Sequence, residues 1–269
     1  ALLAGGALAL AFLLPNHYPP WAAFQAEAMA ALALAPLGLW SGFQRRRPGA
    51  LVVGALVLSS IPLLQLAIGQ IQFAGDAWIA WLYISGFGLA VHCGGCLVDR
   101  SGRGPGSLEV LVPIQVGVLA ASLVSTLLAA RQWLDLGFVS DFVIEKSTAS
   151  RPYANLAQPN QLATLLMLGM AATIFLYEAA RVRAWYALLA AMTLAFGLAM
   201  TQSRTAMLGC GVAWIAVFAL RRRAHLRTTL AAMLVITAFY GVLMWAWPHL
   251  ESILLLSRES TLGERMHSD

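Results

Sequence analysis

Charged residues are scarce in this chain. Only 11% of its 269 residues are Asp, Glu, Lys or Arg, and 60% are hydrophobic, whereas an ordinary soluble protein carries about 25% charged residues. A chain with so little charge has few polar side chains with which to cover a water-facing domain. The composition therefore excludes an ordinary soluble domain and predicts an all-α, polytopic integral membrane protein.

Several chemical motifs are also missing. Three cysteines, an odd number, give no disulfide framework, and Cys93 and Cys96 lie at the end of an apolar run, a context that does not favour a redox or metal role. No Gly-rich phosphate loop, HExxH or GxSxG pattern occurs, which argues against nucleotide hydrolysis, zinc proteolysis and a serine hydrolase. No acidic cluster accompanies the arginines, so we expect no metal and no cofactor.

Nine apolar runs make up most of the sequence, and we interpret each as a transmembrane helix. They are residues 1–14, 21–43, 50–68, 77–98, 110–130, 162–180, 185–200, 205–220 and 228–247. The first is shorter than the roughly 20 residues that a span needs, and no Met precedes it, so we expect the chain to begin inside its first helix. We expect residues 1–269 to form a single transmembrane domain, the N-terminal part of a longer protein.

The basic residues alternate between the connections of these runs. Every second connection together holds eleven of the 17 Lys and Arg residues: Arg45, Arg46, Arg47, Arg100, Arg103, Arg181, Arg183, Arg221, Arg222, Arg223 and Arg227. The positive-inside rule places this set in the cytoplasm, and the loops 15–20, 69–76, 131–161, 201–204 and 251–269 outside. The net charge of +5 then reflects membrane orientation, and we do not expect nucleic acid as a partner.

Two polar segments stand out on the predicted exterior. The first polar segment comprises residues 149–165, and the second comprises residues 201–205. Each comes directly before an apolar run, so each predicts the start of a helix, with Pro159 in the first turn of one and Ser203 as the N-cap of the other. A helix N-terminus beside an arginine favours an anion. Arg151 and Arg204 therefore predict a site for a phosphate-bearing molecule at one membrane face.

Arg204 has a second interpretation. An unpaired charge deep in the bilayer costs roughly 2.5 to 3.5 kcal/mol, but a long side chain can reach the interface and reduce that cost. Arg204 could therefore act only as an interfacial anchor.

Three pieces of the sequence together resemble the bacterial O-antigen ligase superfamily. They are PNHYPPWAAFQAE at 15–27, RPYANLAQPNQLATLL at 151–166 and TQSRTAMLG at 201–209. The QPN-x-LA element is the most specific, and the first piece is similar to the start of the protein O-oligosaccharyltransferases, which glycosylate pilin-like proteins. Gly263-Glu264-Arg265 resembles the arginine segment before the family's large periplasmic loop. That loop carries an essential histidine and would lie beyond Asp269.

This resemblance implies a GT-C-type glycosyltransferase of the bacterial inner membrane whose active site faces the periplasm. Its donor would be a glycan linked to undecaprenyl pyrophosphate, and its acceptor a Ser or Thr of a periplasmic or pilin-like protein. Breaking the bond between sugar and pyrophosphate develops negative charge on the leaving group. Guanidinium groups and helix N-termini can stabilise that charge without a metal.

Eight residues are the candidates for this site. We expect Arg204, Arg265 and Gln158 to be catalytic, and Arg151, Tyr153, Asn155, Asn160 and Ser203 to bind substrate. The amides cannot act as bases at neutral pH, so we assign Gln158, Asn155 and Asn160 to orienting the sugar or the acceptor. The general base is not evident in this sequence.

Other functions stay open. A lipid A-core O-antigen ligase or an O-antigen polymerase would share the donor and differ in the acceptor. An anion transporter would place its charges near the middle of the membrane at broken helices, whereas these arginines lie at helix starts on one face. In a structural scaffold, replacement of either polar segment would change only the abundance of the protein.

Overall fold

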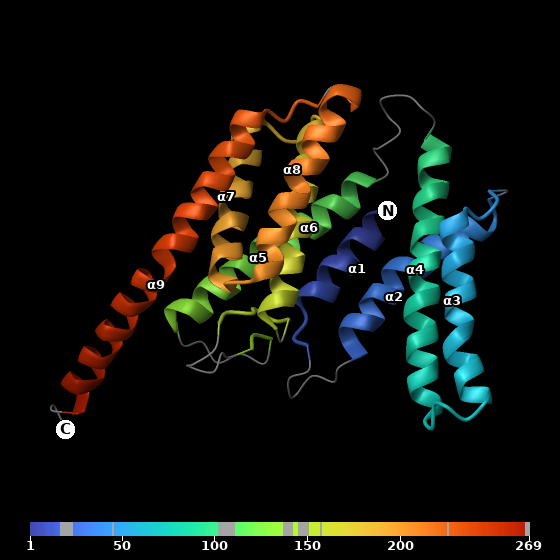
Figure 1. Cartoon of the computed structure of the whole chain (residues 1–269), viewed down its shortest axis with the longest axis horizontal. Helices are drawn as coiled ribbons and strands as arrows, with labels where there is room; N and C mark the ends of the chain where they lie inside the picture. Colours follow the sequence, from blue (N-terminus) through green and yellow to red (C-terminus); the bar gives the residue numbers. More distant parts are fainter. Residues whose placement is uncertain are drawn as a thin grey trace. The chain divides into compact units, whose positions relative to one another are not determined.

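The computed structural model describes residues 1–16, 24–44, 46–101, 111–136, 142–144, 151–156, 158–224 and 226–266, with the backbone alone at 99–101, 222–224 and 254–266. All regular secondary structure in these residues is helical (Figure 1). The helices are α1 (Leu2–Leu13), α2 (Phe24–Gly42), α3 (Ala50–Ala67), α4 (Ala74–Ser101), α5 (Val112–Leu134), α6 (Pro159–Glu178), α7 (Ala184–Thr201), α8 (Arg204–Ala224) and α9 (Leu230–Met266). Each corresponds to one predicted apolar run, so the all-α prediction is confirmed.

Seven of these helices, α3 to α9, are long and apolar enough to cross a membrane. The chain is therefore a multi-pass membrane protein, as predicted. α1 has 12 residues and is shorter than a span. α2 is not among the seven helices that are both long enough and apolar enough. α9 differs from the expected loop at 251–269, because its helix continues through Pro248 to Met266. A proline removes one helical hydrogen bond and bends the helix, and the Leu, Glu and Arg residues that follow favour its continuation.

The chain divides into two compact units. Unit 1 comprises Ala1–Leu8 and Ala28–Ile114. In this unit α3 and α4 pack together, and Gly88 lies so close to α3 that a Cβ atom on it would be 3.1 Å from the Cβ of Ala55. Arg46 also donates a hydrogen bond of 2.6 Å to the carbonyl of Gly95. Small residues thus allow the close helix approach that is typical of membrane proteins.

Unit 2 comprises Ala9–Glu27 and Gln115–Asp269 and contains the main buried core. Here α6 packs against α7 and α8, and α7 packs against α9. Ser122 of α5 donates a hydrogen bond of 3.0 Å to the carbonyl of Leu165 in α6, and a Cβ on Gly169 would lie 2.4 Å from the same hydroxyl oxygen. α5 and α6 are therefore in close contact at Leu165 and Gly169.

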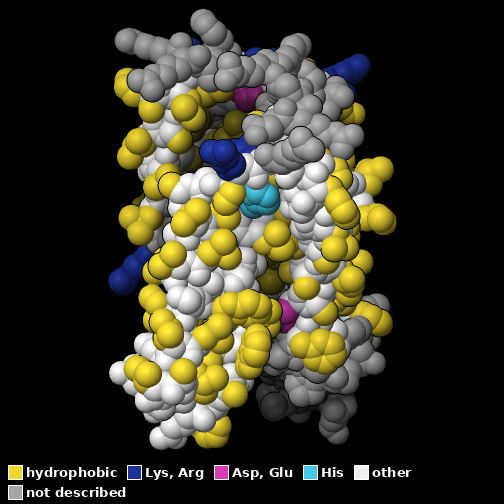
Figure 2. Space-filling model, turned by 90° about the vertical axis from the view of Figure 1, so that its right-hand side faces the viewer, with side chains coloured by type: hydrophobic (Ala, Val, Ile, Leu, Met, Phe, Trp, Pro, Cys, Tyr) yellow, Lys and Arg dark blue, Asp and Glu magenta, His cyan; other side chains and the backbone are white. Residues whose placement is uncertain are grey.

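Large hydrophobic side chains cover the outer surfaces of the helices. Leu208, Ile215, Phe218 and Trp245 are each more than 70% exposed. Figure 2 shows one face on which hydrophobic side chains are widespread and charged ones are few. Such a surface is stable in lipid but not in water, which agrees with the membrane assignment.

The connections of unit 2 lie at alternate ends of its helices. The α5–α6 connection and the α7–α8 turn are at one end, and the α6–α7 and α8–α9 connections are at the other (Figure 1). The two polar segments therefore share one end, as the alternation of basic residues predicted. At the opposite end, the Glu178 carboxylate accepts hydrogen bonds from the backbone N–H groups of Arg227 at 2.8 Å and Thr228 at 2.7 Å. These bonds tie the start of α9 to the end of α6.

Candidate functional site

The α7–α8 turn forms one side of the candidate site. Gln202 ends α7 in the left-handed conformation, with φ 47° and ψ 35°, and α8 begins two residues later at Arg204. The Ser203 side chain between them is fully buried. Its hydroxyl donates a hydrogen bond of 2.9 Å to Oδ1 of Asn160 in α6. Ser203 thus precedes α8 at the predicted N-cap position, and its side chain joins the two polar segments.

The start of α6 forms the second side. Gln158 is the N-cap residue with an extended backbone, φ −140° and ψ 136°, and Pro159 follows in the first turn, as predicted. The Gln158 side chain is exposed and makes no capping hydrogen bond. Its amide is therefore free of any capping role and accessible for another partner.

Arg151 connects the first polar segment to the end of α7. Its Nη1 donates hydrogen bonds to the carbonyl oxygens of Thr201 at 3.2 Å and Gln202 at 3.0 Å. Carbonyl groups at a helix C-terminus lack helical partners and carry a partial negative charge, so a guanidinium is well placed there. Arg151 therefore has a structural role at the α7–α8 turn in addition to its predicted contact with phosphate.

Arg204 is placed differently from Arg151. It is the first residue of α8, and its side chain is exposed and makes no hydrogen bond or ion pair with the described part of the chain. A cation at a helix N-terminus lies at the positive end of the helix dipole, where an anion is favoured. The Arg204 guanidinium and the positive end of the α8 dipole together would attract a negatively charged molecule more strongly than either alone.

Asn155 was predicted to bind substrate, but its side chain is buried. Its side chain is 2% exposed and donates hydrogen bonds to the carbonyls of Leu13 at 2.7 Å and Phe142 at 2.9 Å. Its Oδ1 accepts a hydrogen bond of 3.1 Å from the N–H of Ile144. These contacts give Asn155 a structural role, and its contact with substrate stays a prediction.

Gln132, which lies near the end of α5, is a further residue of this region that was not predicted from the sequence. This side chain is buried and makes four hydrogen bonds to the backbone of residues 144, 153 and 154. A polar residue in the last turn of an apolar helix was the feature of the sequence that could have indicated this role, since buried polar groups need partners. The side chain of Tyr153 is half-buried, and the Arg265 side chain lies outside the described residues.

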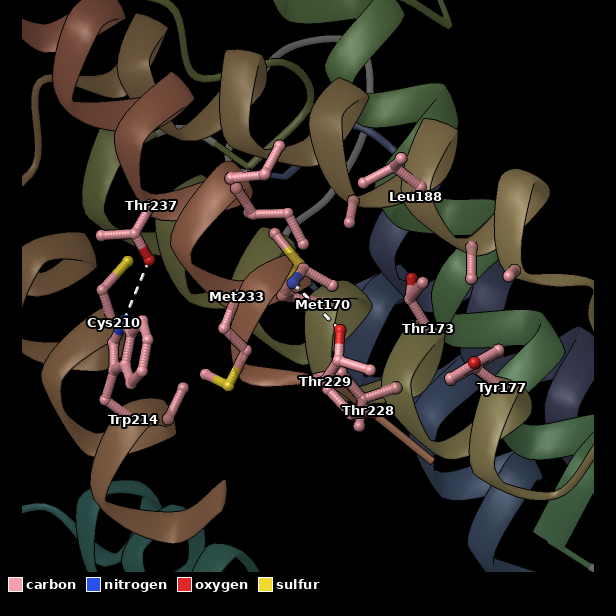
Figure 3. Close-up of a pocket in the computed structure, with 18 of the residues that line it drawn as sticks. Met170, Thr173, Tyr177, Leu188, Cys210, Trp214, Thr228, Thr229, Met233 and Thr237 are labelled. Carbon is pink, nitrogen blue, oxygen red and sulfur yellow. Dashed lines mark hydrogen bonds between the residues drawn. The ribbon is translucent and has the colours of Figure 1, made fainter. Parts of the chain in front are cut away.

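A separate apolar pocket of about 550 Å³ lies among α6, α7, α8 and α9. None of the described residues that line it is charged, and among them Nε1 of Trp214 donates a hydrogen bond of 2.9 Å to Oγ1 of Thr237 (Figure 3). Its lining of α6 begins at Met170, which a rise of 1.5 Å per residue places about 15 Å along the helix from Asn160. The pocket is therefore distinct from the polar site.

Comparisons with known proteins match these segments. A family model described as protein glycosylation ligase matches residues 152–177, which span most of the first polar segment and nearly all of α6. A "General O-oligosaccharyltransferase" of Acinetobacter baylyi is 31% identical over 207 residues, which are 76% of this chain and 35% of that protein. The chain thus matches about a third of the length of this relative. No solved structure matches the chain.

Proposed function

Because this chain belongs to the family of O-antigen ligases and O-oligosaccharyltransferases, we propose that its natural full-length form is a protein O-oligosaccharyltransferase. The enzyme moves a glycan from undecaprenyl pyrophosphate to a Ser or Thr hydroxyl of a periplasmic or pilin-like protein. Its setting is the bacterial inner membrane, with the site facing the periplasm. Similarity to a relative named for oligosaccharide transfer and an all-helical membrane architecture of the GT-C type support this assignment.

The junction between the two polar segments is the observation that carries the proposal. The hydrogen bond between Ser203 and Asn160 brings the N-terminal turns of α6 and α8 together at one end of unit 2. The starts of two helices, with Arg204 beside them, form a site suited to an anion, because the first N–H groups of a helix lack partners within it. The pyrophosphate of the donor fits this chemistry.

The reaction breaks the bond between C1 of the sugar and the pyrophosphate oxygen, and the acceptor hydroxyl oxygen forms the new bond to C1. The electron pair of the broken bond stays on the pyrophosphate, whose added negative charge Arg204 and the helix starts stabilise. Arg265 supplies a second guanidinium, and Arg151 and Tyr153 line the binding site. The amides of Gln158 and Asn160 orient the sugar or the acceptor. The hydroxyl proton passes to a general base, and the resemblance places an essential histidine beyond Asp269.

Reconstitution of the natural full-length protein tests this function. We expect transfer of glycan from undecaprenyl-pyrophosphate-linked donor to a purified pilin, and strongly reduced transfer by the Arg204→Ala variant. Lipid A core is supplied as the competing acceptor, and donor without acceptor reports polymerisation. Transfer to lipid A core alone, or growth of the glycan on its lipid carrier alone, would replace the assignment with an O-antigen ligase or a polymerase.

A further inference from the structure

The Gln132 side chain holds the loop that presents Arg151. It is 4% exposed, and its amide nitrogen donates to the carbonyls of Ile144 and Ala154, both at 2.9 Å. Its amide oxygen accepts from the N–H groups of Tyr153 at 3.0 Å and Ala154 at 2.8 Å. Both hydrogens and the oxygen are used, so the whole amide is committed to this loop.

Two of these bonds hold Ala154 from both sides, because its N–H and its C=O both bind Gln132. Ala154 has a positive φ of 52°, a conformation that is uncommon for a residue with a side chain and that persists only where the surroundings enforce it. Residues 151–156 form no helix or strand, so their backbone groups depend on partners elsewhere. Gln132 supplies those partners from a rigid helix.

Arg151 lies three residues before Ala154 and extends to the α7–α8 turn, where it binds the carbonyls of Thr201 and Gln202. The chain of contacts therefore runs from α5 through Gln132 and Ala154 to Arg151, and from Arg151 to the residues directly before Arg204. A shift of the loop would move the Arg151 guanidinium away from this turn.

We propose that Gln132 is a positioning residue for the donor site, which sets the place of Arg151 relative to the N-terminus of α8. This inference rests on the proposed function. Gln132 touches neither donor nor acceptor and acts only through the loop. An amide suits the position because it offers two donors and an acceptor at once, whereas a carboxylate would face the carbonyls of Ile144 and Ala154 without a hydrogen to share.

The experiment compares Gln132→Ala with Thr126→Val in the natural full-length protein. Thr126 is a matched control, because it is also buried in α5 but its hydroxyl, within the described residues, donates to the carbonyl of Ser122 in the same helix. Rates per folded molecule are measured with varied undecaprenyl-pyrophosphate-linked glycan at saturating pilin, and in a second series with varied pilin at saturating donor. We expect Gln132→Ala to lower kcat/KM for the donor by about 10- to 100-fold, the scale expected when a group is misplaced by about 1 Å. The KM for the acceptor and the kinetics of Thr126→Val should stay near wild type.

A double-mutant cycle with Arg151→Ala distinguishes positioning from general stability. If Gln132 acts through Arg151, adding Gln132→Ala to Arg151→Ala should cost less than about two-fold more, because the two losses are coupled. Gln132→Glu is the second variant, which keeps the two accepted bonds and loses the two donated ones, and should also lower donor kcat/KM.

Three results would overturn the inference: unchanged kinetics per folded molecule in a Gln132 variant, fully additive losses in the cycle, or failure of every Gln132 variant to fold. The last result would assign Gln132 to the fold alone. Failure of the proposed function is a separate result, since the wild-type protein would then transfer no glycan to pilin.

Discussion

At the scale of single residues, the two arginines of the site have different environments. Arg151 binds backbone carbonyls at the end of α7, whereas Arg204 is exposed at the start of α8. A side chain with internal partners contributes to the fold, and one without them is available for substrate. Substitutions at the two positions should therefore have different effects.

Replacement of Arg204 should reduce catalysis without unfolding the protein. Arg204→Lys keeps the charge but loses the planar fork that binds two phosphate oxygens, so substantial activity should be lost. Arg204→Ala should cost more, roughly 10²- to 10³-fold, as when one charge-stabilising donor is removed. The measurement is the transfer rate per folded molecule at saturating donor. Arg183→Ala is the control, because Arg183 is an exposed arginine just before α7 at the opposite end. Full activity in Arg204→Ala would leave Arg204 as an interfacial anchor.

Gln158→Ala should lower transfer while protein level and donor binding stay near wild type. The side chain is exposed and makes no capping bond, so its removal should change stability by no more than about 0.5 kcal/mol. A neutral amide contributes hydrogen bonds and not charge, so its loss should affect orientation of the sugar or acceptor. The two quantities to compare are transfer rate and folded yield; equal reductions in both would assign Gln158 to the start of α6 alone.

At the scale of elements, the described residues 142–144 and 151–156 between α5 and α6 form no helix or strand and are held by side-chain hydrogen bonds. Asn155 joins residues 151–156 to the end of α1 and to residues 142 and 144, and Gln132 joins them to α5. Buried polar groups that are fully paired make such a loop rigid. Rigidity at this place is consistent with a site that must hold a charged group in a defined position.

The asparagines of this loop and of α6 should separate stability from activity. Asn155→Ala removes three hydrogen bonds to the backbone, one of them from the buried N–H of Ile144. Leaving a buried donor unsatisfied costs about 1 to 3 kcal/mol, so thermal stability in detergent should fall clearly. Asn160 is exposed and accepts one hydrogen bond, from the Ser203 hydroxyl, so Asn160→Ala should cost less stability than Asn155→Ala and should reduce transfer per folded molecule. Thermal unfolding and transfer rates are measured on both variants. A stable but inactive Asn155→Ala protein would favour the predicted contact with substrate.

At the scale of the whole molecule, the orientation in the membrane decides whether the candidate site can meet the proposed donor. Both polar segments lie at one end of unit 2 (Figure 1), and the basic residues predict that this end is outside. A lipid-linked glycan that has already crossed the membrane is accessible only from that side.

Labelling of single cysteines tests this orientation. Cys93, Cys96 and Cys210 form no disulfide and are first replaced by Ser or Ala. A cysteine at Ser140 should then react with an impermeant thiol reagent added to intact spheroplasts, and a cysteine at Arg183 should react only after lysis. The opposite pattern would place both polar segments in the cytoplasm and contradict the proposed donor.

Local features of this protein were readable from the sequence by itself. The scarcity of charge and the lengths of the apolar runs predicted the helical membrane fold, because lipid imposes the same requirement on every span. Pro159 and Ser203 marked the starts of α6 and α8 correctly, since a helix start depends on residues a few positions apart. The last helix was predicted to end at residue 247, and this was wrong, because α9 continues through Pro248. A proline can bend a helix without ending it.

The partners of the polar side chains were decided only by the tertiary structure. Asn155 donates to Leu13, 142 residues earlier in the chain, and Gln132 and Arg151 bind segments 22 and 50 residues away. Apolar runs of similar composition can pack in many arrangements, so the sequence pattern does not specify which helix ends meet. The packing of α5, α6 and α7 at small residues such as Gly169 and Gly197 selects one arrangement. That packing brings the two polar segments together at one end of unit 2.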